Sequence, residues 1–364
     1  MESAIGAGAP ARRIEVSEHC YLNEIPGFAE AELARLYGHI HSSLAFFRTF
    51  RPRDGVSTYV ARQDGVPVTL LVFRCDGRRV DVYNEMCFIP GVDIGRFARY
   101  VFSHLDHVHI ISFKGVLSDP LRLPFPLLRY DAKENWEIEL PATPEEYTAR
   151  LGKATRENVK RYRRRLERDH PSFEQQFHTA GEIDEQQVRD ILALSRSRIE
   201  AKKMKFGLDE ADVARVVSLA KECGLVTVLR VGGQICAGTI SYCVGSEYLA
   251  HMIGHDPRYD AYWVGTLCYY TTICESISRG AKKFHMGGGR HEYKTRLLGV
   301  RRDMDRIDIY RSSGHLFLHF DEVLKTGLRV LTRKTKVWLL EREKSLVTRS
   351  VFSVLHTLRR LRGN

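Results

Sequence analysis

Residues 225–254 read LVTVLRVGGQICAGTISYCVGSEYLAHMIG, and this stretch decides the fold. Valine, threonine, tyrosine and leucine are concentrated in Leu225–Val231, Gln234–Val244 and Glu247–Gly254, as is typical of strands. Glycine-containing turns at 232–233 and 245–246 separate these runs. Because such turns are short, the three strands are predicted to pair in antiparallel order.

The residues that follow predict a crossover from strand to helix to strand. After a loop at Asp256–Trp263, apolar residues at helical spacing predict a helix over Gly265–Arg279. Lys282–Met286 is then the next predicted strand. If this helix connects neighbouring strands, its start and the end of that strand lie at one edge of the sheet, the usual ligand edge of α/β folds.

The N-terminal half repeats this order of elements. Its predicted strands, helix and last strand are Val56–Arg62, Val66–Arg74, Arg78–Met86, Asp93–Leu105 and His107–Phe113, in that sequence. We therefore predict a mixed α/β protein of two tandem domains, each with a mostly antiparallel sheet flanked by helices. The predicted boundaries are 1–140 for the first domain, 141–315 for the second and 316–364 for a basic helical tail.

Three helices are predicted at the start of the second domain. Thr143-Pro-Glu-Glu146 is a capping box with proline at the first helical position, and it predicts one long helix that reaches Leu166. Asp184 opens a second helix, and the third runs from Asp209 to Cys223.

Composition favours a cytoplasmic protein. No apolar run approaches the roughly 18–20 residues that a membrane span requires, and Met1–Pro10 carries no basic residue of the kind that opens a secretory signal. The eight cysteines include no Cys-x-x-Cys pair, so we expect reduced thiols and no metal site.

The net charge of +11 is concentrated in two segments. Residues 323–364 hold eleven Lys/Arg against two Glu, a net charge of +9, and residues 150–169 hold nine Lys/Arg against three acids, a net charge of +6. Such segments favour a phosphorylated substrate, an anionic membrane surface or nucleic acid as partner. Nucleic acid is disfavoured, because no helix-turn-helix, zinc-finger or ribonucleoprotein signature is present. The tail at 323–364 is predicted to contact an anionic inner membrane, with packing against the body as the alternative.

The segment Phe284-His-Met-Gly-Gly-Gly-Arg-His-Glu-Tyr-Lys294 is the strongest candidate for chemistry. Three successive glycines after a strand give an open backbone, and the polar side chains that follow can donate, accept or titrate. The alternative is a flexible turn before a charged helix.

This segment resembles the C-terminal signature of the CelD-like acetyltransferases, which belong to the GNAT superfamily and are similar to the tandem-domain FemABX peptidyltransferases. The resemblance rests on His-Met-Gly-Gly-Gly-Arg with Glu-Tyr-Lys, followed by Leu-Leu-Gly-Val and the alternating strand Asp303–Tyr310. It covers residues 145–312, including the basic helix 151–165 and the turn 254–259. His285 departs from the pattern, because many relatives have aspartate there.

The resemblance implies acyl-CoA as co-substrate, no metal, and a small-molecule or lipid-linked glycan acceptor. The implied catalytic residues are Lys294, Tyr293, His285 and His291, with Lys294 as a charge near the acyl group or an acceptor phosphate. The implied cofactor-binding residues are Gly254, His255, Tyr259, Val264, Gly265 and Thr266. The implied substrate-binding residues are Arg156, Lys160, Arg163, Gly288, Gly289 and Arg290, the first three being expected near the domain junction.

A structural, non-catalytic role is the alternative for each of these groups of residues. Lys294 can be a surface lysine, His285 a packed core histidine, and residues 153–168 a solvated helix face. The predicted function is acyl-CoA-dependent N-acylation, or O-acylation, of a sugar, amino sugar or lipid-linked envelope precursor. The alternatives are a FemABX-like aminoacyl transferase, with transfer RNA as donor, and a non-catalytic GNAT-like protein of envelope function or antimicrobial-peptide resistance. The first domain is expected to lack catalysis and to form one wall of the acceptor cleft.

Overall fold

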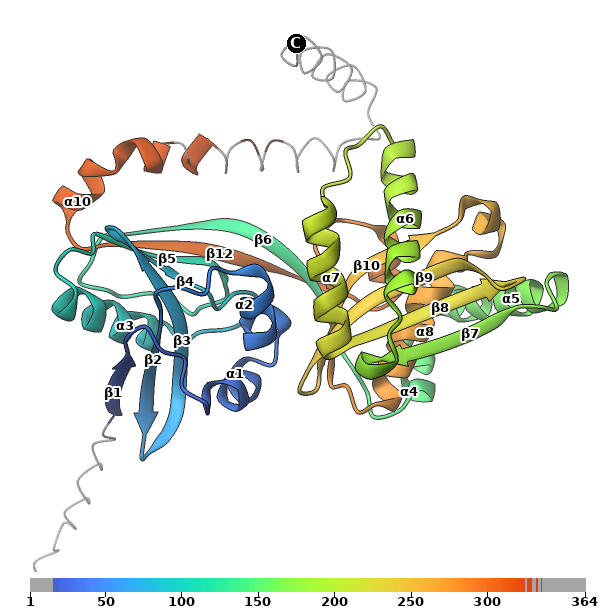
Figure 1. Cartoon of the computed structure of the whole chain (residues 1–364), viewed down its shortest axis with the longest axis horizontal. Helices are drawn as coiled ribbons and strands as arrows, with labels where there is room; N and C mark the ends of the chain where they lie inside the picture. Colours follow the sequence, from blue (N-terminus) through green and yellow to red (C-terminus); the bar gives the residue numbers. More distant parts are fainter. Residues whose placement is uncertain (1–15, 325, 329–331, 333–334, 336–364) are drawn as a thin grey trace, which may run out of the picture.

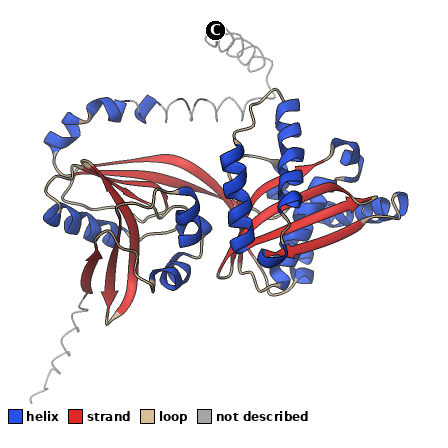
Figure 2. Cartoon of the chain, in the orientation of Figure 1, coloured by secondary structure: helices blue, strands red, loops and turns tan. Residues whose placement is uncertain are grey.

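The computed structural model describes residues 16–324, 326–328, 332 and 335, and the strands of this part form one twelve-stranded mixed sheet. Helices cover both faces of the sheet (Figures 1 and 2). The predicted mixed α/β class is therefore confirmed.

The first half contains the predicted strand–helix–strand order and several elements that the sequence did not predict. Its strands are β1 (Val16–Tyr21), β2 (Val56–Gln63), β3 (Val66–Asp76), β4 (Arg79–Val82), β5 (Ile110–Val116) and β6 (Leu127–Glu139). Its helices are α1 (Ala29–Tyr37), the 3-10 turn η1 (Ile40–Ser42), α2 (Leu44–Phe50) and α3 (Gly91–His104). The elements without a prediction are β1, α1, η1, α2 and β6.

The second half repeats this plan. Its strands are β7 (Glu174–Thr179), β8 (Gly224–Val231), β9 (Gln234–Val244), β10 (Glu247–His255), β11 (Lys283–Gly287) and β12 (Val300–Tyr310). Its helices are α4 (Pro144–Arg150), α5 (Lys153–Asp169), η2 (Ala180–Glu182), α6 (Glu185–Ala201), α7 (Glu210–Cys223), η3 (Pro257–Tyr262), α8 (Val264–Ser278), α9 (Glu292–Arg296) and α10 (Ser313–Leu318).

One predicted helix is wrong. The segment that begins at Pro144 is two helices, because Leu151 and Gly152 adopt extended backbone and Gly152 is the N-cap of α5. Leu151 packs in the cluster beneath α8, whereas Val159 and Leu166 of α5 pack in a separate cluster. The break lets the two helices face different parts of the core.

The predicted crossover is confirmed. β10 and β11 are parallel neighbours, and α8 connects them. The start of α8 and the end of β11 therefore lie at the same edge of the sheet. Helices α6 and α7 cover one face of the second half, and α4, α5 and α8 cover the other (Figure 1).

The two halves exchange their last strands. The sheet order is β1-β2-β3-β4-β5-β12-β6-β11-β10-β9-β8-β7. β12, from the end of the second half, pairs with β5, and β6, from the end of the first half, pairs with β11. These two long strands also pair with each other along Val300–Ile309. Strand pairing thus crosses the predicted boundary at residue 140; the three domain boundaries themselves stay predictions.

No helix in the described residues is both long and apolar enough to cross a membrane. Most of the predicted membrane-binding tail, including Trp338 and residues 351–361, lies outside the described residues.

Candidate functional site

The parallel strands β10 and β11 stop pairing well before β10 ends, and we call the unpaired stretch of β10 beside the end of β11 the opening. They pair only from Glu247 with Lys283 to Leu249 with His285. Beyond this point β10 continues to His255 with β9 as its partner, and a β-bulge falls between Ala250 and Met252. The edge of β10 that faces β11 therefore carries backbone groups that no described strand pairs, and an extended ligand can add to such an edge.

A glycine turn lies at the end of β11, beside this opening. Gly287 and Gly289 have φ angles of +65° and +92°, which L side chains rarely adopt. Lys294 donates from Nζ to the carbonyls of Gly287 at 2.9 Å and Gly288 at 2.6 Å, and Glu134 of β6 accepts the Gly289 N–H at 3.0 Å. The turn is thus held by one helix residue and one residue of the exchanged strand. Arg290 also pairs with Glu134, at 3.3 Å.

Lys294 is buried rather than exposed. Only 1% of the residue is accessible, and burial lowers the pKa of its ammonium to about 8, partly countered by Glu134. It therefore stays mainly protonated at neutral pH while its N–H groups bond to two carbonyls. In this structure the ammonium holds the turn and does not reach an open groove, unlike the charge near the acceptor that the resemblance implied.

His291 and Tyr293 lie side by side after the turn. Their rings are 5.8 Å apart and nearly parallel, with an interplanar angle of 14°. Burial, together with the charges of Lys294, Lys202 and Arg198, lowers the pKa of His291. Burial raises the pKa of Tyr293 to about 12. A neutral imidazole thus stands next to a neutral phenol at pH 7.

His285 is buried on β11. Its Nδ1 lies 2.8 Å from the Asn135 side-chain nitrogen and its Nε2 lies 2.7 Å from a Glu247 carboxylate oxygen. The ring of His39, from the first half, contacts it edge-on at 4.4 Å. With both nitrogens engaged and 3% exposure, His285 links β6, β10, β11 and η1. This is the packed-histidine alternative.

Other residues pack closely against Gly254 and Gly265, leaving no room for a side chain at either position. A Cβ on Gly254 would lie 2.3 Å from the Ile191 carbonyl oxygen, so α6 crosses directly over it. A Cβ on Gly265 would lie 2.6 Å from Nδ1 of His255, so that imidazole rests on the first turn of α8. His255 also bonds Asp260 at 3.0 Å, and burial lowers its pKa.

The other predicted cofactor residues divide between core and surface. Val264 is buried in the cluster between α5 and α8, and Tyr259 packs against His170 at the end of α5. Thr266 lies half-buried in the first turn of α8, where amide groups lack intrahelical acceptors. His255, Val264, Gly265 and Thr266 thus lie at the start of α8, with Val264 buried in the core. Their role in cofactor binding stays a prediction.

The predicted substrate residues do not form one site. Arg156, Lys160 and Arg163 line a groove of about 660 Å³ between α4, α5, α8 and β7, with two glutamates in the same wall. Gly288, Gly289 and Arg290 lie at the end of β11 instead. The expectation that α5 lies near the domain junction is wrong, because Figure 1 places α5 on the side away from the first half.

Sequence reasoning missed four residues around the opening. Arg198 and Lys202, near the end of α6, lower the pKa of both His255 and His291 by their positive charge. Glu134 and Asn135 come from β6, a strand that was not predicted. Nothing in the local pattern near these residues indicates that they meet at β11.

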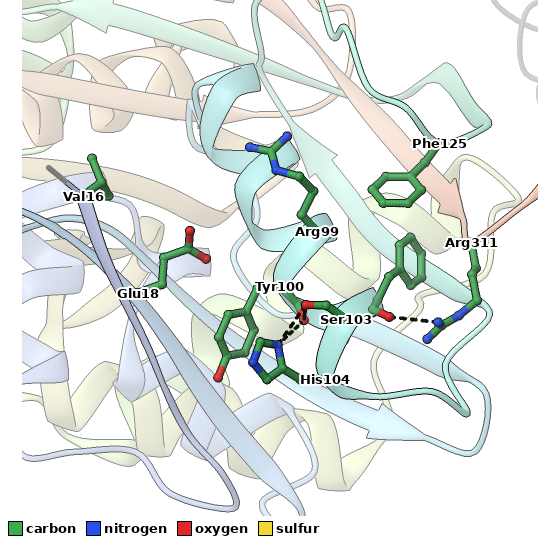
Figure 3. Close-up of a pocket in the computed structure, with 9 residues that line it drawn as sticks. Val16, Glu18, Arg99, Tyr100, Ser103, His104, Phe125 and Arg311 are labelled. Atoms are coloured by element: carbon green, nitrogen blue, oxygen red, sulfur yellow. Dashed lines mark hydrogen bonds between the residues drawn. The ribbon is translucent and has the colours of Figure 1, made fainter. Parts of the chain in front are cut away.

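A cavity of about 750 Å³ in the first half does not assemble comparable chemistry (Figure 3). Its arginine Arg311 donates to the carbonyls of Phe102 at 2.8 Å and Val108 at 2.7 Å. His104 lies 2.9 Å from the carbonyl of Tyr100. Arg311 thus links the end of β12 to α3 and to the loop before β5, the His104 contact lies within α3, and we assign the cavity no role.

Comparison with known proteins finds a family match within the second half. Residues 153–295 match the family described as an acetyltransferase (GNAT) domain. The fold is similar to the crystal structure of FemX, with 8% identity, a TM-score of 0.57, and 83% of this chain and 99% of that chain covered. It is also similar to a conserved protein of unknown function from Bacteroides thetaiotaomicron VPI-5482, with 12% identity and a TM-score of 0.51. This match covers 79% of this chain and 98% of that chain. At these identities the likeness shows the fold alone. No curated protein matches the sequence.

Proposed function

We propose that this chain, whose residues 153–295 form a GNAT-family domain, is an acyl-CoA-dependent N-acyltransferase. The proposed acceptor is a sugar, an amino sugar or a lipid-linked precursor of the cell envelope. The observation that carries the proposal is the opening between β10 and β11, with the glycine turn and the His291–Tyr293 pair beside it.

The opening suits an extended acyl thioester. The unpaired edge of β10 beyond Leu249 supplies backbone groups for a linear pantetheine arm, and its N–H groups can polarise the thioester carbonyl. His255, Gly265 and Thr266 at the start of α8 would face the diphosphate, where helix amides favour an anion. The imidazole of His255 must then share this space, because it already rests on Gly265.

Two neutral groups complete the chemistry. The acceptor amine attacks the thioester carbonyl carbon, so that a C–N bond forms and the C–S bond breaks. His291 accepts the proton that the amine loses, because its lowered pKa keeps the imidazole neutral at pH 7. Tyr293 donates its phenolic proton to the departing thiolate, and solvent then carries the extra proton from the His291 imidazolium to the Tyr293 phenolate. Lys294 is a positioning residue that fixes the turn.

Anionic acceptors fit the α6 side of the opening. Helix α6 packs over β10 at Gly254, and the positive charges of Arg198 and Lys202, near its end, lower the pKa of His291. We assign recognition of an acceptor phosphate to them, because the groove of Arg156, Lys160 and Arg163 lies on the α8 side of the sheet instead.

Ligand-induced thermal stabilisation tests the donor. Binding at one hundred times Kd adds about 2.7 kcal/mol to the free energy of unfolding, so acetyl-CoA or a longer acyl-CoA should raise Tm in a concentration-dependent way. Thiol release in the presence of amino sugars then tests transfer. Absence of any shift with every thioester would reject the proposal and leave aminoacyl transfer or a non-catalytic scaffold.

Matched variants test the proposed roles of His291 and Arg198. His291→Ala should lower kcat about 10²–10⁴-fold while the acetyl-CoA shift is retained; His104→Ala, an exposed histidine of the first half, is its control. Arg198→Ala should raise the acceptor KM, whereas Arg196→Ala, whose guanidinium stacks over Phe206 at 5.0 Å, should not. Equal rates for the two histidine variants would remove His291 as the base.

A further inference from the structure

The helical segment after β12 is oriented with its polar side toward the protein. α10 is followed by helical residues at 320–324 and 326–328. On the inner side, His315 and His319 contact His109 with ring distances of 4.2 and 5.7 Å, and Glu322 pairs with Arg79 of β4. The helix is therefore anchored to the body by polar and aromatic contacts.

Its apolar side faces outward. Phe317, Leu318, Phe320, Leu324 and Leu328 are 73, 61, 57, 54 and 56% exposed. The steps of three and four residues between positions 317, 320, 324 and 328 place them along one side of a helix. We call these four residues, together with the adjacent Leu318, the apolar stripe. The described residues include twelve large apolar side chains that are exposed, and five of them lie in this segment of twelve residues, 317–328.

Such an arrangement marks this side of the helix as an interaction surface. A surface helix of a globular protein normally turns its apolar side to the core, and exposed apolar patches mark interaction sites. Packing against the body was the alternative expected for this tail. For residues 315–322 that contact exists, but it uses the polar side and leaves the apolar stripe open.

We infer that the apolar stripe inserts into the headgroup region of an anionic lipid bilayer. The sequence from 323 to 364 carries a net charge of +9, which complements anionic headgroups. The same charge opposes association of two copies through this helix, because each copy would bring a +9 segment to the interface. An apolar side flanked by basic residues is the composition of interfacial helices. This inference does not depend on the acyltransferase proposal.

Vesicle co-sedimentation of the full chain tests the inference, with phosphatidylcholine vesicles that contain or lack phosphatidylglycerol. The test variant replaces four stripe residues by serine: Phe317→Ser, Phe320→Ser, Leu324→Ser and Leu328→Ser. The control variant replaces four similarly exposed apolar residues elsewhere by serine: Leu22→Ser, Val66→Ser, Val92→Ser and Met204→Ser. Both variants keep every charge, and their Tm values verify that they are folded.

The wild type and the control variant should bind the anionic vesicles. The test variant should bind them at least about tenfold more weakly, because the buried apolar area is lost. Equal binding by the test and control variants would overturn the inference in favour of charge alone. A wild-type dimer in sedimentation velocity that only the test variant loses, with unchanged vesicle binding, would identify a second copy as the occupant instead.

Discussion

Gly254→Ala distinguishes a packing role from a cofactor role for this glycine. The new Cβ would lie 2.3 Å from the carbonyl oxygen of Ile191, 2.9 Å from Cβ of Leu194 and 3.0 Å from the amide nitrogen of Ser195. Two of these atoms belong to the backbone of α6, so no side-chain rotation relieves the contact. Either α6 moves away from β10 or β10 itself shifts.

The cost follows from the rigidity of these neighbours. Added volume in a packed core typically costs 1–3 kcal/mol, and a clash with helix backbone belongs at the upper end, so we expect a loss of about 3 kcal/mol. At about 2–4 °C per kcal/mol, Tm should fall by roughly 6–12 °C. Urea and thermal unfolding of the ligand-free protein measure both quantities.

Gly207→Ala is the matched control. A Cβ there has no heavy atom within 4 Å, and the glycine does not have a positive φ angle, so the control should be neutral or up to about 1 kcal/mol more stable. If Gly254→Ala instead matches this control in ligand-free stability and loses only the acetyl-CoA shift, the packing argument is refuted. The glycine would then serve the cofactor, as the resemblance implied.

Three further substitutions test the buried polar groups. In the folded protein Lys294 has a pKa of about 8, below its usual 10.5, so the unfolded chain binds more protons between these two pH values. The free energy of unfolding of the wild type should therefore increase as pH rises from about 8 to 10.5. Lys294→Met should remove this increase, as measured by urea unfolding at a series of pH values. Burial alone would raise the pKa of Glu247, but the hydrogen bonds and charges of His285 and Lys283 together outweigh burial, so the pKa lies below 4.5. The stabilisation from this carboxylate is present above about pH 4.5 and is lost as pH falls through the folded value. Glu247→Gln should therefore flatten the acid side of the stability curve and cost about 1–3 kcal/mol at pH 7. Gly265→Ala should displace the His255 ring and bring its lowered pKa back toward 6.5, and an unchanged NMR titration would contradict that contact.

The repeated strand and helix order was predictable because its signals are local. Val56–Gln63 and Gln234–Val244 carry strand composition between glycine turns, and both strands form as predicted. The capping residues Asp184 and Asp209 mark the starts of α6 and α7 correctly. The start at Thr143 was also correct, but the break at Gly152 was missed. Apolar spacing continues across that break, although the two helices face different clusters.

The sequence predicted which segment forms the candidate site, but not the role of each residue within it. Phe284–Lys294 lies at the opening between β10 and β11, yet the direction of each side chain depends on strands that are distant in sequence. Lys294 turns inward because the carbonyls of its own glycine turn meet it there. His285 is enclosed because β6 and η1 bring Asn135 and His39 against its ring. No local pattern encodes these contacts.

The exchange of last strands changes how the first half relates to the site. The first half lacks a glycine-rich segment after β5, and on sequence grounds it is a wall beside a separate catalytic domain. However, its strand β6 is the neighbour of β11, and Glu134 and Asn135 of β6 bond the glycine turn and His285. In return β12 completes the sheet of the first half through β5. Each half therefore depends on the other for the strand at its inner edge, and the geometry of the glycine turn is a property of the whole chain.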